Sequence, residues 1–207
     1  MDKELLHQLE TPCVVLDTRM AEENIKKLQA ACDACGVKLR PHIKTHKMPL
    51  FAKMQLAAGA DGVTCAKVGE AEVMADGGVD DIFIAYPMVG DFRVRRVIAL
   101  AKRLRRLILG VDSLEIAKPL SAAAVEAGVT LEVRLEVDTG AKRTGVERDK
   151  AAALAVAIHN LPNLNLTGLY TFKSLVYPVR PSRQKAADVA EQHHERRDGV
   201  LQWCDAR

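Results

Sequence analysis

Residues 131–138 read Leu131-Glu132-Val133-Arg134-Leu135-Glu136-Val137-Asp138, with apolar side chains at the odd positions and charged ones at the even positions. This alternation is typical of a β-strand, because successive side chains point to opposite faces of a sheet. The segment lies in a series of strands and helices, in which helices cover the outer face of a parallel sheet. The charged row then faces either solvent or the interior of a closed sheet, where charges have to pair. A barrel would give this row partners, including Arg40 and Lys44, so the segment favours a barrel-type α/β fold.

Strands and helices alternate along the rest of the chain at intervals of about 20 to 25 residues, the length of a strand, a helix and two short loops. An apolar strand is expected at residues 11–17, and Asp17 or Thr18 can cap the helix that follows. Strands of the barrel type are then expected at residues 37–44, 62–66, 81–86, 107–112, 131–138 and 164–170. Helices are expected at residues 20–35, 51–56, 68–75, 92–106, 114–127 and 151–159, and from 182 onward. Because a closed (β/α)8 TIM-type barrel has eight strands, we predict one incomplete domain over residues 1–207, a partial barrel with about six of them.

Composition argues against several classes of protein. The chain has 207 residues, 48% of them hydrophobic, and a net charge of +3, which is ordinary for a globular domain. No global field favours nucleic acid or an anionic membrane. The N-terminus lacks the form of a signal peptide, the apolar runs are strand-sized, and the five scattered cysteines suit a reducing compartment. A cytoplasmic protein is therefore expected.

Two local features have alternative interpretations. The expected helix at 92–106 carries seven arginines and lysines, which is typical of a solvated face. A nucleic-acid surface is the alternative, and it predicts salt-dependent binding of any DNA. Cys32 and Cys35 form a single Cys-x-x-Cys inside a helical pattern, and without a second pair they do not indicate a zinc site.

The richest ionisable segment is Arg40-Pro41-His42-Ile43-Lys44-Thr45-His46-Lys47. Lys44 falls at the C-terminal end of its expected strand, where an α/β barrel keeps its active site. A lysine there can form a Schiff base with a carbonyl. The neighbouring cations suit an anionic aldehyde such as pyridoxal 5′-phosphate, whereas a simple Schiff-base aldolase needs only the lysine. The residues alone leave both open, along with a merely solvated strand end.

This segment is one of four that together resemble a known family. The others are Thr11-Pro12 with Asp17, Cys65-Ala66-Lys67-Val68-Gly69-Glu70-Ala71, and residues 136–146, which contain Asp138-Thr139-Gly140 and Arg143. Their order and spacing are similar to those of the D-threonine aldolase and D-serine dehydratase family, within the alanine-racemase-like, fold-type III pyridoxal-phosphate barrels. The resemblance covers nearly the whole chain.

The resemblance implies roles for five residues. Lys44 would carry the cofactor as a Schiff base and act as the base at the substrate α-carbon, and His42 would flank it. Arg143 would lie beside the cofactor ring, and Tyr170 and Tyr177 would contact the cofactor. The structural alternatives are an Arg143 that pairs with Asp138 or Glu136, and tyrosines that only fill the core.

The chain also departs from the family. Residues 171–176 read Thr171-Phe172-Lys173-Ser174-Leu175-Val176 where relatives have a histidine and a glycine, so Phe172 and Lys173 alter the site. The family's glycine-rich phosphate loop and its C-terminal β-domain, which holds a divalent metal, have no counterpart in 207 residues. We therefore expect no metal ligands here.

The resulting prediction is a pyridoxal-phosphate-dependent lyase acting on D-amino acids through Lys44, as an aldolase or a dehydratase. The alternative is a truncated, inactive relative that at most binds the cofactor. The expected partner is a small-molecule D-amino acid, with a homodimer as the assembly to test, and neither nucleic acid nor a membrane.

Overall fold

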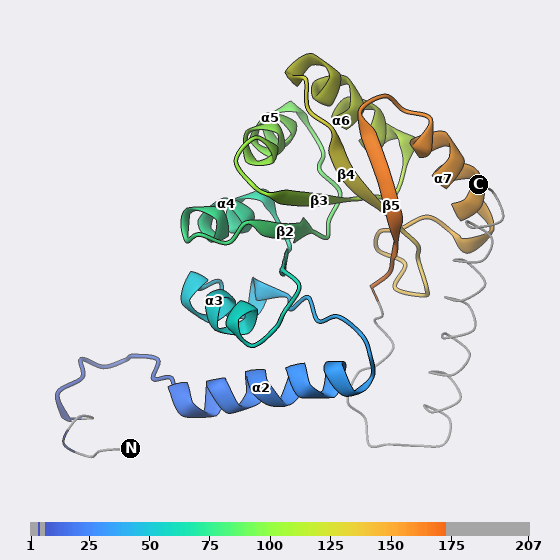
Figure 1. Ribbon diagram of the computed structural model, residues 1–207. Helices are drawn as coiled ribbons and strands as arrows, with labels where there is room; N and C mark the ends of the chain where they lie inside the picture. The colour runs from blue at the N-terminus through green and yellow to red at the C-terminus, as the bar shows by residue number, and fades with distance from the viewer. Residues whose placement is uncertain (1–3, 5–6, 173–207) are drawn as a thin grey trace.

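The computed structural model describes residue 4 and residues 7–172 (Figure 1). Helices and strands alternate in the order α2 (Thr18–Ala34), η1 (Ile43–Thr45), α3 (Pro49–Ala57), β1 (Val63–Cys65), α4 (Val68–Asp76), β2 (Asp81–Ile84), α5 (Asp91–Ala101), β3 (Arg106–Val111), α6 (Leu114–Ala127), β4 (Leu131–Glu136), α7 (Arg148–His159) and β5 (Leu164–Tyr170). The strands form one parallel sheet in the order β1-β2-β3-β4-β5. The predicted α/β architecture is confirmed.

The two faces of the sheet differ in chemistry. Figure 1 shows α4, α5, α6 and α7 along one face, and the hydrophobic core lies between these helices and the sheet. The core side chains of β2, β3 and β4 are Ile82, Ile84, Leu107, Leu109, Val111, Leu131, Val133 and Leu135. The opposite face carries the alternate residues, among them Glu132, Arg134 and Glu136. The charged row predicted for residues 131–138 therefore lies on the face that the helices do not cover.

The expected strand at residues 37–44 is reduced to one parallel bridge between His42 and Thr64, followed by the single 3-10 turn η1. Pro41 has no N–H to donate to a ladder, although its carbonyl accepts the Thr64 N–H at 2.8 Å. The prediction of six barrel strands was therefore one too many for the described residues. Residues 11–17 do not form the expected strand either: Val14 is 90% exposed.

The helix predictions agree more closely with the structure. Asp17 caps α2 as expected, with Oδ1 accepting the N–H groups of Arg19 at 3.0 Å and Met20 at 3.1 Å. The bounds of α6 match the prediction, and Gly128 ends it with a left-handed φ of 64°, a conformation that glycine adopts readily. The helix predicted for 92–106 ends earlier, at Ala101, because Arg106 already belongs to β3. The helix expected from residue 182 lies outside the described residues.

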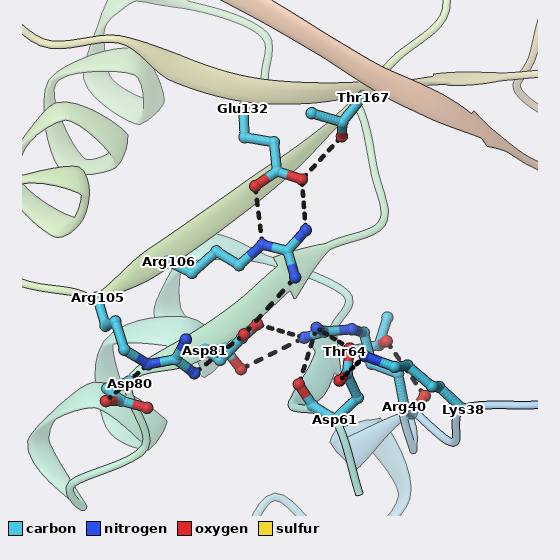
Figure 2. A network of polar contacts seen from close by, with 10 residues as sticks. All are labelled: Lys38, Arg40, Asp61, Thr64, Asp80, Asp81, Arg105, Arg106, Glu132 and Thr167. Atoms are coloured by element: carbon cyan, nitrogen blue, oxygen red, sulfur yellow. Dashed lines mark hydrogen bonds and ion pairs between the residues drawn. The ribbon is translucent and has the colours of Figure 1, made fainter.

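A network of ion pairs joins the N-terminal ends of the strands (Figure 2). Asp81 at the start of β2 binds Arg40 at 2.6 Å and Arg105 at 3.1 Å. Arg106 at the start of β3 donates two hydrogen bonds to Glu132, at 2.8 and 2.7 Å. Glu132 is ion-paired as predicted for the charged row, but the expected partners were wrong. Within the described residues Arg134 and Glu136 of this row form no ion pair. Arg40 binds Asp81 and Asp61, and it is Arg106 that binds Glu132.

The basic segment at 92–106 is also largely paired. Four of its seven basic side chains form ion pairs, namely Arg96, Arg103, Arg105 and Arg106. Their partners are Glu72, Asp76, Asp80, Asp81 and Glu132. This pairing agrees with the interpretation of a solvated face in which charge is balanced. Among the described residues, no helix has the length and apolarity that crossing a membrane requires.

Candidate active site

Lys44 lies in η1, which follows the His42 bridge at the C-terminal edge of β1. Ile43 is fully buried and anchors the turn, and its carbonyl accepts the Lys47 N–H at 2.8 Å. His42 caps the turn, because its Nδ1 accepts the backbone N–H of Lys44 at 3.3 Å. The turn therefore fixes the backbone of Lys44 and leaves its side chain exposed.

The two histidines beside Lys44 do not add the positive charge that the sequence led us to expect. Burial lowers the pKa of His42, the Lys44 charge lowers it further, and Glu70 only partly opposes these effects. Burial also lowers the pKa of His46. Both imidazoles are therefore neutral at neutral pH, which also suits Nδ1 of His42 as a hydrogen-bond acceptor.

The other cations expected around Lys44 are held by carboxylates. Arg40 is bound by Asp61 and Asp81 at the opposite edge of the sheet. Lys47 lies 3.5 Å from Glu70, whose other oxygen accepts the Ala66 N–H at 2.8 Å. The cation beside Lys44 that no carboxylate of the described residues binds comes instead from a distant part of the sequence.

That cation is Arg143, in the loop between β4 and α7. Asp138 folds this loop, because its Oδ1 accepts the N–H of Gly140 at 2.9 Å and that of Lys142 at 3.1 Å. Gly145 has a φ of 101°, and a Cβ there would lie 2.7 Å from the Asp138 nitrogen. Only glycine fits this close approach without strain. The loop leaves the Arg143 side chain exposed at the edge of the sheet.

Lys44 and Arg143 meet at the ring of Phe172, directly after β5. The Arg143 Cζ lies 4.5 Å from the ring centroid and the Lys44 Nζ lies 5.6 Å from it. Both distances are within the range of a cation–π contact. The fold thus brings a lysine amine and a guanidinium to one place at the C-terminal edge of the sheet.

Arg143 does not form the ion pairs that were its structural alternative. Asp138 accepts backbone N–H groups of its own loop. Glu136 is 3% exposed, and its two oxygens accept the hydroxyls of Thr144 at 3.0 Å and Tyr170 at 2.9 Å. Within the described residues Arg143 makes no ion pair, so its charge is available to an anion.

Tyr170 lies at the end of β5 and pairs with Glu136, on the face of the sheet that the helices do not cover. Its ring meets that of Phe83 edge to face, with centroids 4.9 Å apart. Its hydroxyl occupies the space that a side chain at Gly110 would fill, because a Cβ there would lie 2.2 Å from the oxygen. Burial and the nearby Glu136 carboxylate raise the pKa of Tyr170, and burial likewise raises the pKa of Glu136. The phenol therefore keeps its proton and donates a hydrogen bond to Glu136.

The sequence identified only part of this arrangement. Glu136 was recognised as a member of the charged row, and its place at the end of β4 was the signal that could have assigned it to the site. Phe172 was noted only as a departure from the family. Tyr177 and Lys173 lie outside the described residues. In the part of the chain that the structure describes, no three His, Cys, Asp or Glu side chains are placed to hold a metal ion.

The domain is of the partial α/β barrel class, with a lysine at the C-terminal edge of its sheet and a guanidinium that forms no ion pair within the described residues. The sequence profile of the family described as "Alanine racemase, N-terminal domain" matches residues 16–205, so the chain belongs to this family.

The chain is similar to several curated enzymes. It is 38% identical to D-threonine aldolase of an Arthrobacter species over 188 residues, which cover 90% of this chain and 49% of that protein. It is 34% identical to 3-hydroxy-D-aspartate aldolase of Paracoccus denitrificans over 168 residues, 80% of this chain and 43% of that protein. The predicted resemblance is confirmed, and the chain spans about half the length of these relatives.

Solved structures agree. The D-threonine aldolase of Filomicrobium marinum matches with a TM-score of 0.92 and 33% identity, over 97% of this chain and 54% of that one. An alanine racemase of Streptomyces lavendulae matches with a TM-score of 0.70 at 22% identity, over 90% of this chain and 47% of that one, which is a likeness of fold. The partial barrel predicted from the sequence is therefore supported by structure as well.

Proposed function

We propose that this chain supplies the lysine-bearing part of a pyridoxal-phosphate-dependent lyase that acts on D-amino acids by aldol cleavage or by β-elimination of water. The observation that carries the proposal is the meeting of Lys44 and Arg143 at Phe172. The names of the relatives support the reaction types and the D configuration. The proposal includes one incomplete barrel domain over residues 1–207, a cytoplasmic location and a small D-amino acid as the partner.

The chemistry of the donor set fits the cofactor, which is an anionic aldehyde. Lys44 offers an exposed primary amine to the carbonyl carbon. Arg143 offers a guanidinium that no carboxylate in the described residues occupies, and such a group binds phenolate or carboxylate oxygens well. When bound, pyridoxal phosphate supplies an electron sink for bonds broken at the α-carbon.

The residues of the chain divide the remaining work. The Lys44 Nζ would be the covalent attachment point and, in β-elimination of water, the base that accepts the proton of the substrate α-carbon. Arg143 binds the anionic group that lies beside it. His42 holds the Lys44 backbone through its hydrogen bond, and Tyr170 stays protonated because Glu136 accepts its hydroxyl. Thr144 donates a hydrogen bond to the second oxygen of Glu136.

A second candidate is a catalytically inactive relative that at most binds the cofactor. The observation that bears on it is Phe172, which lies where relatives were expected to have a histidine and a glycine and which contacts Lys44 and Arg143. The two candidates differ in turnover of a D-amino acid. Release of acetaldehyde from D-threonine, or of pyruvate from D-serine, would support the lyase over the binder.

The first prediction concerns the attachment site itself. The purified chain is incubated with pyridoxal phosphate, reduced with borohydride and mapped by peptide mass spectrometry. We expect the label on Lys44, and we expect Lys44→Ala to lose at least about nine tenths of it, because a Schiff-base lysine reacts far faster than an ordinary surface lysine.

Lys67→Ala is the matched control. Lys67 is also an exposed lysine at the C-terminal edge, next to β1, so its removal should leave the labelling of Lys44 unchanged. If Lys44→Ala takes up as much label as the wild type, Lys44 is not the attachment point and the proposed function fails.

A further inference from the structure

Phe172 is anchored on the side from which the chain enters it. The carbonyl of Tyr170 accepts the N–H of Val137 at 2.9 Å. The hydroxyls of Thr171 and Thr139 lie 2.7 Å apart. The backbone that leads from β5 into Phe172 is therefore tied to the segment that leaves β4. These hydrogen bonds fix the position of the backbone from which the Phe172 side chain extends.

The ring contacts two cations that belong to different parts of the sequence. Arg143 lies after β4 and Lys44 lies before β1, and both side chains stand over the same ring. Because like charges repel, the Lys44 and Arg143 side chains would move apart if nothing attracted both of them. The negative face of an aromatic ring attracts both of them.

No carboxylate among the described residues binds either cation. Lys44 and Arg143 form no ion pair there, whereas the neighbouring Lys47 is held by Glu70. A carboxylate would hold a cation but also neutralise it. An aromatic ring holds a cation and leaves its charge available to an anionic ligand.

We propose that Phe172 is a positioning residue whose ring holds the Lys44 ammonium and the Arg143 guanidinium together, so that both face one anionic carbonyl ligand. This inference rests on the proposed function and deepens it. The ring orients the attachment amine and the anion-binding group before the ligand arrives.

The test uses the full chain with four substitutions. Phe172→Leu and Phe172→Met keep an apolar side chain and remove the ring. Phe172→Tyr keeps the ring and should rescue. Phe92→Leu is the matched control, because the Phe92 ring also lies under an arginine, with the Arg96 Cζ 5.0 Å from its centroid, on the distant helix α5.

The first readout needs no added ligand. Lysines are reductively methylated with carbon-13 formaldehyde, which keeps their charge, and the Lys44 resonance is assigned with Lys44→Ala. We expect the ring current of Phe172 to displace the Lys44 methyl resonance from those of the other lysines. The displacement should vanish in Phe172→Leu and Phe172→Met, return in Phe172→Tyr, and persist in Phe92→Leu.

The second readout is borohydride trapping of pyridoxal phosphate on Lys44 as a function of cofactor concentration. Loss of the ring should raise the half-saturating concentration about threefold to tenfold, the effect expected for one or two exposed cation–π contacts. Phe172→Tyr should restore the wild-type concentration, and Phe92→Leu should never change it.

Three results would overturn the inference. One is a wild-type Lys44 resonance with no ring-current displacement. Another is a Phe172→Leu protein that traps the cofactor as the wild type does. The third is loss of cooperative unfolding in both the Leu and Met variants, which would make the ring purely structural. Absence of trapping in the wild type overturns the proposed function instead, and the methyl resonance then judges the positioning contact alone.

Discussion

Glu136 is the residue in which the chemistry and the stability of the site are most closely joined. Its carboxylate is buried at the end of β4 and accepts two hydroxyls. Neutral donors satisfy its oxygens, yet they do not supply the positive charge that would offset burial of an anion. Burial therefore raises the pKa of Glu136 above its ordinary value of 4.5. A group of this kind makes stability depend on pH.

The sign of that dependence can be predicted. A carboxyl whose pKa is raised in the folded state contributes stability that is fully present below pH 4.5. This contribution is lost as the pH rises through the folded pKa. In Glu136→Gln the amide oxygen can accept the Tyr170 hydroxyl and the amide nitrogen can donate to Thr144, without any charge. The free energy of unfolding of the wild type should therefore fall relative to that of Glu136→Gln as the pH rises from 4.5, by at most about 1.4 kcal/mol per pH unit.

Urea unfolding followed by circular dichroism between pH 3 and 8 checks this expectation. Glu132→Gln is the control with the opposite sign. Burial opposes ionisation of Glu132, but hydrogen bonds from Arg106 and Thr167 outweigh it, so its pKa is lowered. Its contribution is present above pH 4.5 and lost as the pH falls through the folded pKa. Parallel curves for the wild type and Glu136→Gln across the range would contradict the assignment for Glu136.

Ion pairs connect the N-terminal ends of the strands, whereas the candidate active site lies at their C-terminal ends. Arg40 and Asp81 have side chains only 12% and 6% exposed, so their pairing is a buried one. Arg106 and Glu132 extend the network from β3 to β4 (Figure 2). The network attaches the segment before η1 to the sheet although that segment forms only one bridge.

Substitution of Asp81 should lower the free energy of unfolding much more than substitution of its neighbour Asp80. Asp81→Asn leaves the buried Arg40 without its closest counter-charge, and we expect a loss of about 3–5 kcal/mol in the free energy of unfolding. Asp80→Asn removes only an exposed pair with Arg105, whose side chains are 62% and 61% exposed. Its loss should stay below about 1 kcal/mol.

Urea titrations of both variants at pH 7 provide the measurement. Equal losses in Asp81→Asn and Asp80→Asn would show that the buried pair is not special. A loss confined to Asp81→Asn would show that a charge network, in addition to the apolar core, stabilises the segment that carries Lys44.

At the scale of the whole molecule, the helices differ greatly in how much they bury. Figure 1 shows α2 beside α3 and away from the sheet. Gln29 is the buried residue of this 17-residue helix, whereas Met20 and Leu28 are 60% and 53% exposed. By contrast, α6 buries Ala117, Leu120, Ser121 and Ala124. With so little tertiary packing, α2 depends mainly on its own backbone hydrogen bonds, and an isolated helix is only marginally stable in water.

Hydrogen exchange measured by mass spectrometry should reveal this difference. Amides of α2 are expected to exchange at least about 100-fold faster than those of β3, because they open locally while β3 opens only with the core. The comparison with α6 separates the effect of packing from that of helical structure. Exchange of α2 at the rate of α6 would contradict the prediction and would indicate a cover over its exposed apolar side chains.

The parts of the fold that could be predicted are those set by local spacing. Alternation in β4, the Asp17 cap and the Gly128 stop each depend on neighbouring residues, so they are visible in the chain itself. The strand at 37–44 was over-predicted, because its apolar alternation was weighed above the missing N–H of Pro41. The strand at 11–17 was over-predicted because an apolar run alone does not make a strand. It also needs a neighbouring strand to pair with, and the described sheet offers none to this segment.

Lys44 and the family were accessible from sequence alone, since four ordered motifs lie within the chain. The environment of Lys44 was not. Arg40, Lys47 and the two histidines looked like its cationic neighbours. Carboxylates pair with Arg40 and Lys47, and burial lowers the pKa of both histidines. Arg143, from beyond β4, contacts the Phe172 ring together with Lys44. Local spacing assigns a side chain to a face of a strand. Which strand ends meet depends on the register and curvature of the sheet, and these arise only when distant segments pack together.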